Sequence, residues 1–452
     1  MRATVHPGGF EGGRVWAPGD KSISHRWLIL AATAEGVSEV RGLPPALDVR
    51  STARCLSALV RDETQRALDA WDLEAAASAQ GDRSTGNRTP PRVSKLRIQA
   101  RGRGGLHAPG RPLECGNSGT SMRMLCGVLA AVPFETELRG DKSLSTRPME
   151  RVAEPLRAMG ADVQTTDGHA PVSVRGARLH GVEHVSAVPS AQVKSAILLA
   201  GLAAEGETIV REPVQTRDHT ERALGALGAP VWTEQGRVGV RGFQHPGFAA
   251  TVPGDLSSAA FLIGAAALTG SALRVDGVGL NPTRIGYLEV LARMGVHCRA
   301  AVEREELGEP VGALQVDAGP LRGTTVEASE LPHVIDEVPV LALVSAYARG
   351  ETRFLGAGEL RVKESDRLVG VVEAIRGLGG EASAEGNDLV VAGGGLRGGI
   401  ADTFGDHRLA MAIAVAALAA PEPTTIDGLE AAEVSFPGFV ATLRSLGARV
   451  EA

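Results

Sequence analysis

The sequence predicts an α/β protein built from six copies of one module, because two helical patterns alternate along its 452 residues. The first pattern is a short polar segment followed by an apolar run of small residues. The second is an amphipathic run that ends in glycine and is followed by a strand-like segment. One copy is on the order of 70 residues long, which leaves room for two helices and several strands, and this length indicates a duplicated domain rather than a solenoid.

In the first pattern, each polar segment begins a helix that carries almost no charge and is apolar on every side, so all six helices are expected to be buried. The segments and their helices are Pro18–Arg26 with Trp27–Ala34, Gly116–Thr120 with Met122–Pro133, Ser190–Ser195 with Ala196–Gly206, Gly254–Ser258 with Ala259–Gly270, Ile335–Glu337 with Val338–Gly350, and Gly405–Arg408 with Leu409–Ala420. If the six helix starts face one place, their backbone amides and cations line a cleft.

The segment Pro18–Arg26 shows most clearly what such a helix start can bind. Its turn residues break the chain, and its short polar residues can cap the helix. Lys21 and Arg26 add full positive charges to the positive end of the helix dipole. The segment therefore predicts a site for a phosphate or a carboxylate. The alternative is a capped, buried helix whose two cations only extend toward solvent.

The second pattern places an amphipathic helix between the buried ones. The glycine at its end suits the left-handed conformation that closes many helices. The copies are Cys55–Leu59, Leu156–Val163, Leu224–Gly228, Leu291–Val296, Ile375–Gly379 and Leu443–Val450, of which the first lacks its glycine. One segment interrupts the repeat: residues 61–95 have a polar centre with glycine and proline and are expected to form a surface excursion.

Composition restricts the expected ligand to a small anion. The chain has 47 Lys and Arg against 53 Asp and Glu, a net charge of −6, so it has no overall field for nucleic acid. Its four cysteines show no metal-binding spacing, and no residue set argues for a metal or another cofactor. Free thiols suit a reducing cytoplasm. No apolar stretch reaches the roughly 18 residues of a membrane-spanning helix, so a cytoplasmic protein without a membrane partner is expected.

The polar segments also carry a family resemblance. The strings, in chain order, are Pro18–Arg26, Gly116–Thr120 with Met122 and Arg123, Arg147–Met149, Ser190–Gln192, Lys363–Arg367 and Asp406–Arg408. Together they resemble the 5-enolpyruvylshikimate-3-phosphate synthase family, the 3-phosphoshikimate 1-carboxyvinyltransferases. The resemblance extends over essentially the whole chain and agrees with the sixfold repeat.

The resemblance implies a two-lobed, inside-out α/β barrel with three βαβαββ-like units in each lobe and the helix starts at the cleft between the lobes. The first lobe is expected to contain residues 1–19 and 252–452, and the second residues 20–251. Thr251–Pro253 is the expected second crossing between them. Family members of this type are expected to be monomers.

The implied reaction transfers the enolpyruvyl group of phosphoenolpyruvate to the 5-hydroxyl of shikimate 3-phosphate and releases phosphate. The residues that match the family's shikimate 3-phosphate site are Lys21, Ser22, Arg26, Ser190, Ala191, Gln192, Arg217, Asp336 and Lys363, with Thr216 nearby. Those that match its phosphoenolpyruvate site are Lys21, Asn117, Gly119, Arg147, Gln192, Glu364, Arg367 and Arg408. Burial of such anions requires paired cations, and the planar fork of arginine suits both carboxylate and phosphate. The family's inhibitor glyphosate is expected at the second site.

By the same resemblance, four of these residues are catalytic. Asp336 is the expected base for the 5-hydroxyl, with Lys363 close to the same group. Lys21 and Glu364 are both candidates for the acid that protonates the methylene carbon. Taken without the family, Asp336 has a second interpretation, as the cap of the helix that begins at Val338.

The arginines also have a second interpretation when the family is set aside. Arg367 stands beside Asp366, and Arg408 stands near Asp406, so each can form a solvated pair with its neighbour. One departure from the family concerns Glu433–Pro437, which lacks a lysine that some members direct at phosphoenolpyruvate.

Three other functions are weighed against this one. The sister transferase that acts on UDP-N-acetylglucosamine usually has a cysteine in the loop before an Arg-Pro pair, and the loop Gly140–Pro148 has none. A non-catalytic sensor of a phosphorylated sugar acid would be free to lose Asp336 or Glu364, but both are present. A phosphoryl-transferring kinase is disfavoured because the sequence contains no GxxxxGK[ST] segment.

Overall fold

The six expected buried helices are present in the computed structural model, which describes residues 2–80 and 95–451. They are α1 (Lys21–Thr33), α4 (Gly119–Leu129), α6 (Ala191–Gly201), α8 (Leu256–Thr269), α11 (Val338–Ser345) and α13 (His407–Ala417). Side chains around the whole circumference of each helix are buried, as their apolar sequences predict. Five of the six begin at a side-chain cap, from Asp20, Ser118, Ser190, Asp255 and Asp406.

The exception among the caps is α11. Its first flanking residue is Glu337, whose side chain makes no capping hydrogen bond, and Asp336 stands one residue earlier. The interpretation of Asp336 as a helix cap is therefore wrong, and its carboxylate is free of that role.

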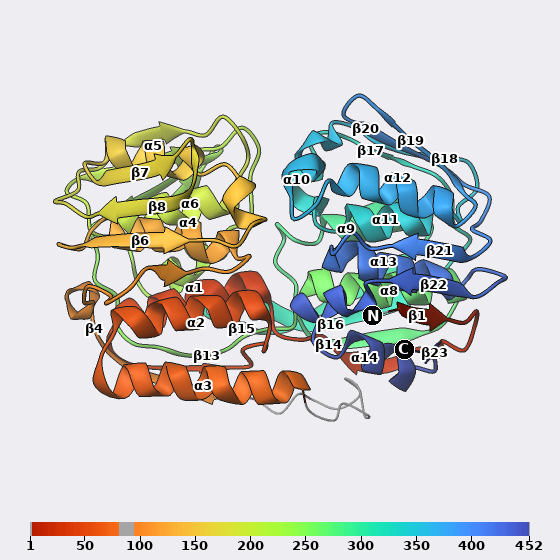
Figure 1. The fold of residues 1–452 in the computed structure, drawn as a ribbon, viewed down its shortest axis with the longest axis horizontal. Helices are drawn as coiled ribbons and strands as arrows, with labels where there is room; N and C mark the ends of the chain where they lie inside the picture. The colour runs from red at the N-terminus through yellow and green to blue at the C-terminus, as the bar shows by residue number, and fades with distance from the viewer. Residues whose placement is uncertain (1, 81–94, 452) are drawn as a thin grey trace.

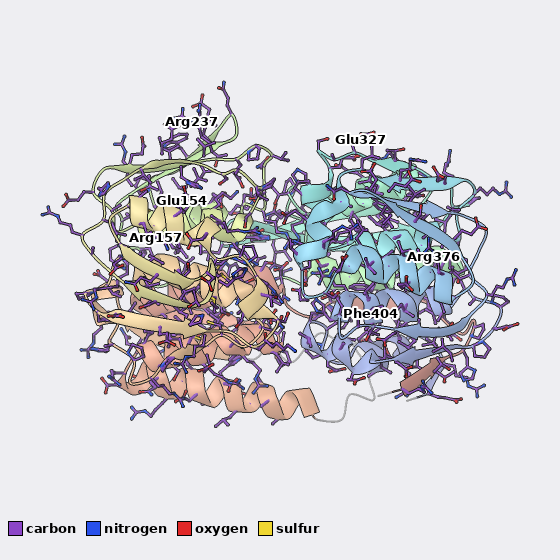
Figure 2. The ribbon with its side chains drawn as sticks, turned by 45° about the horizontal axis from the view of Figure 1, so that its top comes forward. Glu154, Arg157, Arg237, Glu327, Arg376 and Phe404 are labelled. Carbon is purple, nitrogen blue, oxygen red and sulfur yellow. The ribbon has the colours of Figure 1, made fainter. Side chains whose placement is uncertain are left out.

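The amphipathic helices of the second pattern are also present. They are α2 (Leu47–Leu59), α5 (Glu150–Ala158), α7 (His219–Ala226), α9 (Gly286–Arg293), α12 (Arg367–Gly377) and α14 (Phe439–Ser445). Five of them are followed by a glycine with positive φ, and α2 is not. Figure 2 labels charged residues on their exposed faces, Glu154 and Arg157 on α5 and Arg376 on α12.

Each unit contributes one sheet, and five of the six sheets share one strand arrangement. A central strand pairs in parallel with one neighbour and antiparallel with the other, which pairs antiparallel with the fourth strand. These last two strands form a hairpin in four of the sheets and come from the two ends of the chain in the fifth. The five four-stranded sheets, in strand order, are β5 (Leu113–Glu114), β6 (Glu135–Arg139), β8 (His169–Arg175) and β7 (Asp162–Thr166); β9 (Glu183–Val185), β10 (Glu207–Arg211), β12 (Arg237–Arg241) and β11 (Val231–Glu234); β2 (Gly13–Trp16), β14 (Leu273–Gly279), β16 (Glu309–Asp317) and β15 (His297–Glu306); β17 (Thr325–Val326), β18 (Glu351–Phe354), β20 (Asp388–Ala392) and β19 (Glu381–Glu385); and β21 (Gly399–Asp402), β22 (Thr424–Asp427), β1 (Arg2–Val5) and β23 (Val450–Glu451).

The first unit departs from this topology. Its sheet has three strands among the described residues, β13 (Ala249–Thr251), β3 (Glu35–Arg41) and β4 (Lys95–Arg101). Where the other units have their outer hairpin strand, this unit has helix α3 (Asp62–Gln80), which packs against α2 and β4. Leu68, Trp71 and Ala75 form its buried face. The segment expected as a surface excursion therefore begins with a packed helix, and its polar centre, residues 81–94, lies outside the described residues.

Buried hydrophobic side chains form two separate clusters. One contains residues from 3–17 and 256–450, and the other contains residues from 23–252. Figure 1 shows α1 to α6 in one half of the molecule and α8 to α14, with both chain ends, in the other half. We infer from these clusters that the chain forms two lobes, with the first made from both ends of the chain.

The chain passes between the two halves along two antiparallel segments that are hydrogen-bonded to each other. The Asp20 N–H donates to the Pro253 carbonyl and the Asp255 N–H donates to the Pro18 carbonyl, both at 2.7 Å. A Cβ at Gly19 would lie 2.1 Å from the carbonyl oxygen of Gly42, so only glycine fits at this position. Because α1 and α8 begin directly after the two crossings, this arrangement brings two helix starts together at the junction of the halves.

A matched pair of leucines tests the packing of α3. Leu68 is fully buried and Leu73 is 71% exposed on the same helix. We expect Leu68→Ala to lower the free energy of unfolding by about 2–5 kcal/mol, because it removes buried methyl groups and leaves a cavity. We expect Leu73→Ala to change it by less than about 0.5 kcal/mol. Urea unfolding followed by circular dichroism measures both values, and equal effects would contradict the packing of α3 on α2 and β4.

Candidate active site

The starts of all six buried helices line one cavity of about 360 Å³. Its walls include Lys21 and Ser22 of α1, Asn117, Gly119 and Thr120 at α4, Ser190 to Gln192 at α6, Asp255 and Ser257 at α8, Asp336 before α11, and His407 and Arg408 of α13. Thirteen of the fifteen predicted site residues line this cavity, and only Arg26 and Arg367 lie behind its wall. The expectation that the helix starts face one place is thereby confirmed.

Positive charge predominates in this wall. Eight Lys and Arg residues line the cavity against five Asp and Glu residues, although the chain as a whole is acidic. The first-turn amides of the helices add partial positive charge at the same place. The cavity is therefore suited to anions that carry several charges.

Arg26 joins two helix starts from beneath the cavity. Its guanidinium donates to the Ser22 carbonyl, to the Ser195 hydroxyl and to the Thr220 hydroxyl, each at 2.8 Å. It is almost fully buried, and this burial lowers the pKa of Arg26 to about 10. Its geometry fixes the start of α1 against α6, so Arg26 acts on the cavity through Ser22 and its neighbours.

Arg147 is presented by the loop between β6 and α5. Its Nη2 donates to the Asn117 side chain at 2.6 Å and to the Ser143 hydroxyl at 3.3 Å. Its Nη1 lies 3.7 Å from an oxygen of Glu364, which belongs to the other half of the molecule. A cation of one half thus faces a carboxylate of the other.

Arg367 lies behind the cavity wall with its guanidinium fully buried. It donates to Asp406 at 2.8 Å and to Glu364 at 2.5 Å, and it lies 3.6 Å from Asp336. Its partner is thus Asp406 rather than its neighbour Asp366. The interpretation of Arg367 as half of a solvated pair is wrong, because both Arg367 and Asp406 are buried.

The side chain of Asp336 is the meeting point of several cations. Arg408 donates from Nη1 to the Asp336 carbonyl at 2.9 Å and holds Nη2 3.5 Å from the carboxylate. Arg217 forms an ion pair with the same carboxylate. Arg408 therefore pairs with Asp336 and not with Asp406, whose carboxylate caps α13 instead.

Comparisons with known proteins show the family of this chain. The sequence profile of the family described as EPSP synthase (3-phosphoshikimate 1-carboxyvinyltransferase) matches residues 8–81 and 90–443. The chain belongs to this family. Its activity is that of the family, the 3-phosphoshikimate 1-carboxyvinyltransferase reaction of the shikimate pathway.

Individual relatives extend over the full chain. It is 45% identical over 452 residues to the 3-phosphoshikimate 1-carboxyvinyltransferase of Acidithiobacillus ferrooxidans, covering 100% of this chain and 99% of that protein. It is also 45% identical over 452 residues to the enzyme of that name from Methylococcus capsulatus, covering 99% and 98%. A solved EPSP synthase from Acinetobacter baumannii superposes with a TM-score of 0.83 at 38% identity, covering 100% of both chains. The chain thus has the inside-out α/β barrel fold of the EPSP synthase family.

The cavity holds its two central carboxylates ionised. Burial by itself would raise the pKa of the Asp336 carboxyl. The nearby positive charges have a larger, opposite effect and hold this pKa well below its usual range. They belong to Arg408, Arg217, Lys363 and Arg367. For Glu364, burial is likewise outweighed, first by Arg367, and the pKa again lies well below its usual range. Both groups are therefore ready to accept a proton near neutral pH.

Two lysines, Lys363 and Lys21, line the cavity near these carboxylates. Burial lowers the pKa of Lys363, although Asp336 partly compensates. Lys21 forms an ion pair with Asp48, with 2.7 Å between Nζ and Oδ2. Burial raises the pKa of Asp48, but Lys21 outweighs it, so the net pKa of this carboxyl is lowered.

Six charged residues of the cavity had no role assigned from the sequence, namely Asp48, Arg123, Arg151, Asp255, Arg284 and Glu359. Asp48 begins α2, and Arg284 follows β14, and neither belongs to a recognised string. Arg123 lies within a recognised string but was given no role; it donates to Gln192 at 2.6 Å and to the Pro148 carbonyl at 3.1 Å. Arg284 lies 3.5 Å from Asp255 and 3.6 Å from Glu337. Only the tertiary structure brings these residues to the cavity.

The described part of the chain shows neither a metal-binding cluster nor a membrane-spanning helix. Within residues 2–80 and 95–451, no group of three or more metal-binding side chains is close enough to hold an ion. In the same residues, no helix has both the length and the apolarity that a membrane crossing requires. The four cysteines, all of them described, are free thiols.

An Asp→Asn change at Asp406 tests the buried pair with Arg367. Burial raises the pKa of Asp406, but Arg367 outweighs it and holds the pKa below its usual value. Ionised Asp406 therefore adds stability above about pH 4, and this stability is lost as the pH falls through the folded pKa. We expect Asp406→Asn to cost about 3–5 kcal/mol at pH 7, because it leaves the buried guanidinium of Arg367 without one of its two close carboxylate partners.

Denaturation midpoints of the wild type and Asp406→Asn, measured from pH 7 to pH 3, test this expectation. The difference between the two proteins should shrink as the pH falls below about 4. Asp427→Asn is the matched control, because Asp427 pairs with Arg2 at 2.7 Å on the surface and should matter little. A difference that grows toward low pH would contradict the sign.

Proposed function

We propose that the cavity binds shikimate 3-phosphate and phosphoenolpyruvate side by side and joins them through Asp336, Lys21 and Glu364. The observation that supports this most is the convergence of all six helix starts on one cation-rich cavity with two ionised carboxylates. The two substrates carry two phosphates and two carboxylates between them. Such anions can leave water only where paired cations and amides replace their hydration.

Shikimate 3-phosphate is assigned to the side formed by α1, α6 and the loop before α7. Lys21, Ser22, Ser190, Ala191, Gln192 and Arg217 line this side, and Arg26 supports it from beneath. Thr216 stands beside Arg217 in the same wall. The 5-hydroxyl would then face Asp336 and Lys363, which reach this side from the opposite half.

Phosphoenolpyruvate is assigned to the side formed by α4, α12 and α13. Asn117, Gly119, Arg147, Gln192, Glu364 and Arg408 line it, and Arg367 braces Glu364 from behind. Lys21 stands between the two substrate positions at the start of α1. Arginine forks are suited to both the carboxylate and the phosphate of this substrate.

The chemistry requires one proton to leave the hydroxyl and one to reach carbon. The 5-hydroxyl oxygen bonds to C2 of phosphoenolpyruvate as Asp336 accepts the hydroxyl proton and the methylene carbon gains a proton. We assign that proton to the Lys21 ammonium, because Glu364 is held ionised and has none to give. In the second half, Glu364 takes a proton from the new methyl group as the C2–O bond to phosphate breaks, and the leaving phosphate takes the proton that Asp336 had accepted. Glu364 then returns its proton to Lys21, so that all three side chains regain their starting states.

We also propose that the protein acts as a monomer in the cytoplasm, with no metal or other cofactor. One chain supplies all six helix starts of the cavity, so no second copy is needed to complete it. Free cysteines are usual in a reducing compartment. A transferase acting on UDP-N-acetylglucosamine is the competing activity, and the full-length match to the EPSP synthase family counts against it.

Phosphate release from the two substrates tests the proposed reaction and its base. We expect release that requires both shikimate 3-phosphate and phosphoenolpyruvate, and we expect Asp336→Asn to lower kcat by about 10²–10⁴-fold, because the hydroxyl loses its proton acceptor. Glu359→Gln is the matched control, since Glu359 lines the same cavity from the same half and has no assigned role. Release with UDP-N-acetylglucosamine instead, or an undiminished Asp336→Asn, would contradict the proposal.

Gly119→Ala tests the phosphoenolpyruvate position. An added Cβ would lie 2.8 Å from Nη1 of Arg123, so this guanidinium would have to shift, whereas its distance of 3.6 Å from Nη1 of Arg147 is an ordinary van der Waals contact. We expect KM for phosphoenolpyruvate to rise about tenfold, and inhibition by glyphosate to weaken and to remain competitive with phosphoenolpyruvate.

The control for Gly119→Ala is Gly104→Ala, because a Cβ at Gly104 would meet nothing within 4 Å. Steady-state kinetics of both variants measure the change. An unchanged KM for phosphoenolpyruvate in Gly119→Ala, or inhibition independent of its concentration, would count against this position.

A further inference from the structure

The ion pair between Arg217 and Asp336 joins the two halves of the molecule inside the cavity. Arg217 belongs to the loop between β10 and α7, and Asp336 lies between α10 (Leu331–Val334) and α11, 119 residues away. Both side chains are only 17% exposed. The second terminal nitrogen of Arg217 donates to the Ser22 hydroxyl at 3.4 Å. One guanidinium thus contacts the proposed base and a proposed ligand of shikimate 3-phosphate together.

The backbone beside Arg217 is fixed by a buried charge cluster. The ammonium of Lys194 lies 2.7 Å from Glu212 and 2.7 Å from Glu221, and it donates to the Thr216 carbonyl at 3.3 Å. Glu212 in turn accepts from the N–H of Thr216 at 3.3 Å. Lys194 is 1% exposed, so this cluster is part of the core. The residue next to Arg217 cannot shift easily, which leaves the long arginine side chain as the movable part.

The remaining charges that face Asp336 come from three other elements. Arg367 of α12 lies 3.6 Å and Arg408 of α13 lies 3.5 Å from its carboxylate, and Lys363 after the 3₁₀ segment Ala357–Val362 also acts on it. All three belong to the same half as Asp336. Arg217 alone among these cations comes from the half to which we assign the phosphate of shikimate 3-phosphate.

We propose that Arg217 is a latch that pairs with Asp336 until the phosphate of shikimate 3-phosphate takes its guanidinium, so that the phosphate itself makes the base available. The proposal rests on the proposed function. A phosphate dianion carries more charge than a carboxylate and accepts the same bidentate donors, so it competes well for an arginine fork. The alternative is a permanent bridge that only holds the two halves together.

A comparison of shikimate with shikimate 3-phosphate separates the latch from the bridge. The two ligands share the 5-hydroxyl and differ only in the phosphate, so contacts of Asp336 with the hydroxyl cancel in the ratio of their dissociation constants. In a latch, part of the phosphate's binding free energy is used to separate Arg217 from Asp336. We call the ratio of the dissociation constant for shikimate to that for shikimate 3-phosphate the preference for shikimate 3-phosphate. We expect Asp336→Asn to raise this preference about fivefold, because it removes the carboxylate that competes with the phosphate for Arg217.

The decisive measurement is a double-mutant cycle by titration calorimetry. Wild type, Asp336→Asn, Arg217→Gln and the double variant are each titrated with both ligands. In the Arg217→Gln background we expect Asp336→Asn to leave the preference unchanged. Binding of shikimate by each variant also shows that its site is folded. Glu359→Gln, which removes a different carboxylate from the same half, should leave the preference as in the wild type.

Two results would overturn the latch. One is an unchanged preference in Asp336→Asn, which would leave only a permanent bridge. The other is an equal rise in the preference when Asp336→Asn is made in the Arg217→Gln background, or when Glu359→Gln is made alone. Such a rise would mean that the loss of any negative charge near the phosphate has the same effect. If the wild type itself showed no preference for shikimate 3-phosphate over shikimate, the proposed function would fail together with the latch.

Discussion

The constraint on which the rest of this structure depends is the neutralisation of positive charge at one cavity. Eight cations and the positive ends of six helices converge there in a chain whose net charge is −6. Each of the six helices is buried on every side, so the core fixes the positions of their ends. The cations at these ends are therefore held close together and repel one another. Carboxylates placed among the cations, such as Asp336, Glu364 and Asp48, make this arrangement stable.

These carboxylates have two uses. Asp336 and Glu364 neutralise arginines, and the same two groups are the proposed acceptors of protons. A carboxylate surrounded by cations is always ionised, which suits an acceptor but also weakens its basicity. An anionic substrate counteracts this effect, because each phosphate or carboxylate that binds partly neutralises the cations that face Asp336 and Glu364. The two carboxylates then become stronger bases. Binding and the strength of the base are therefore linked through shared arginines.

The sequence predicts those features of the fold that depend on local patterns. Six apolar runs with almost no charge indicate buried helices, and glycines such as Gly160 mark the ends of the amphipathic ones. Helix α3 was not predicted, because the spacing of Leu68, Trp71 and Ala75 stands in an acidic segment outside the repeat. In the site, the motif residues were predicted by resemblance, but their partners were not.

The sequence does not predict the ion-pair partners of the motif residues, because tertiary contacts determine them. Arg367 pairs with Asp406, 39 positions away, and not with its neighbour Asp366. Arg284 belongs to no recognised string and reaches the cavity only because β14 follows the second crossing. A motif thus identifies which side chains carry charge, whereas the fold decides which opposite charge each one meets.

The distribution of charge between the halves completes this argument. Arg217 and Arg147 belong to one half, and the carboxylates of Asp336 and Glu364 that face them belong to the other. The half that carries Asp336 and Glu364 lacks the proposed substrate ligands Ser22, Arg147 and Arg217, so both halves are needed to complete the cavity. The junction at Gly19 and Gly254 holds the two sets within reach while leaving only two strands of chain between them. Substrate anions that replace these cross-cavity pairs therefore act on the contact between the halves and on the base in one step.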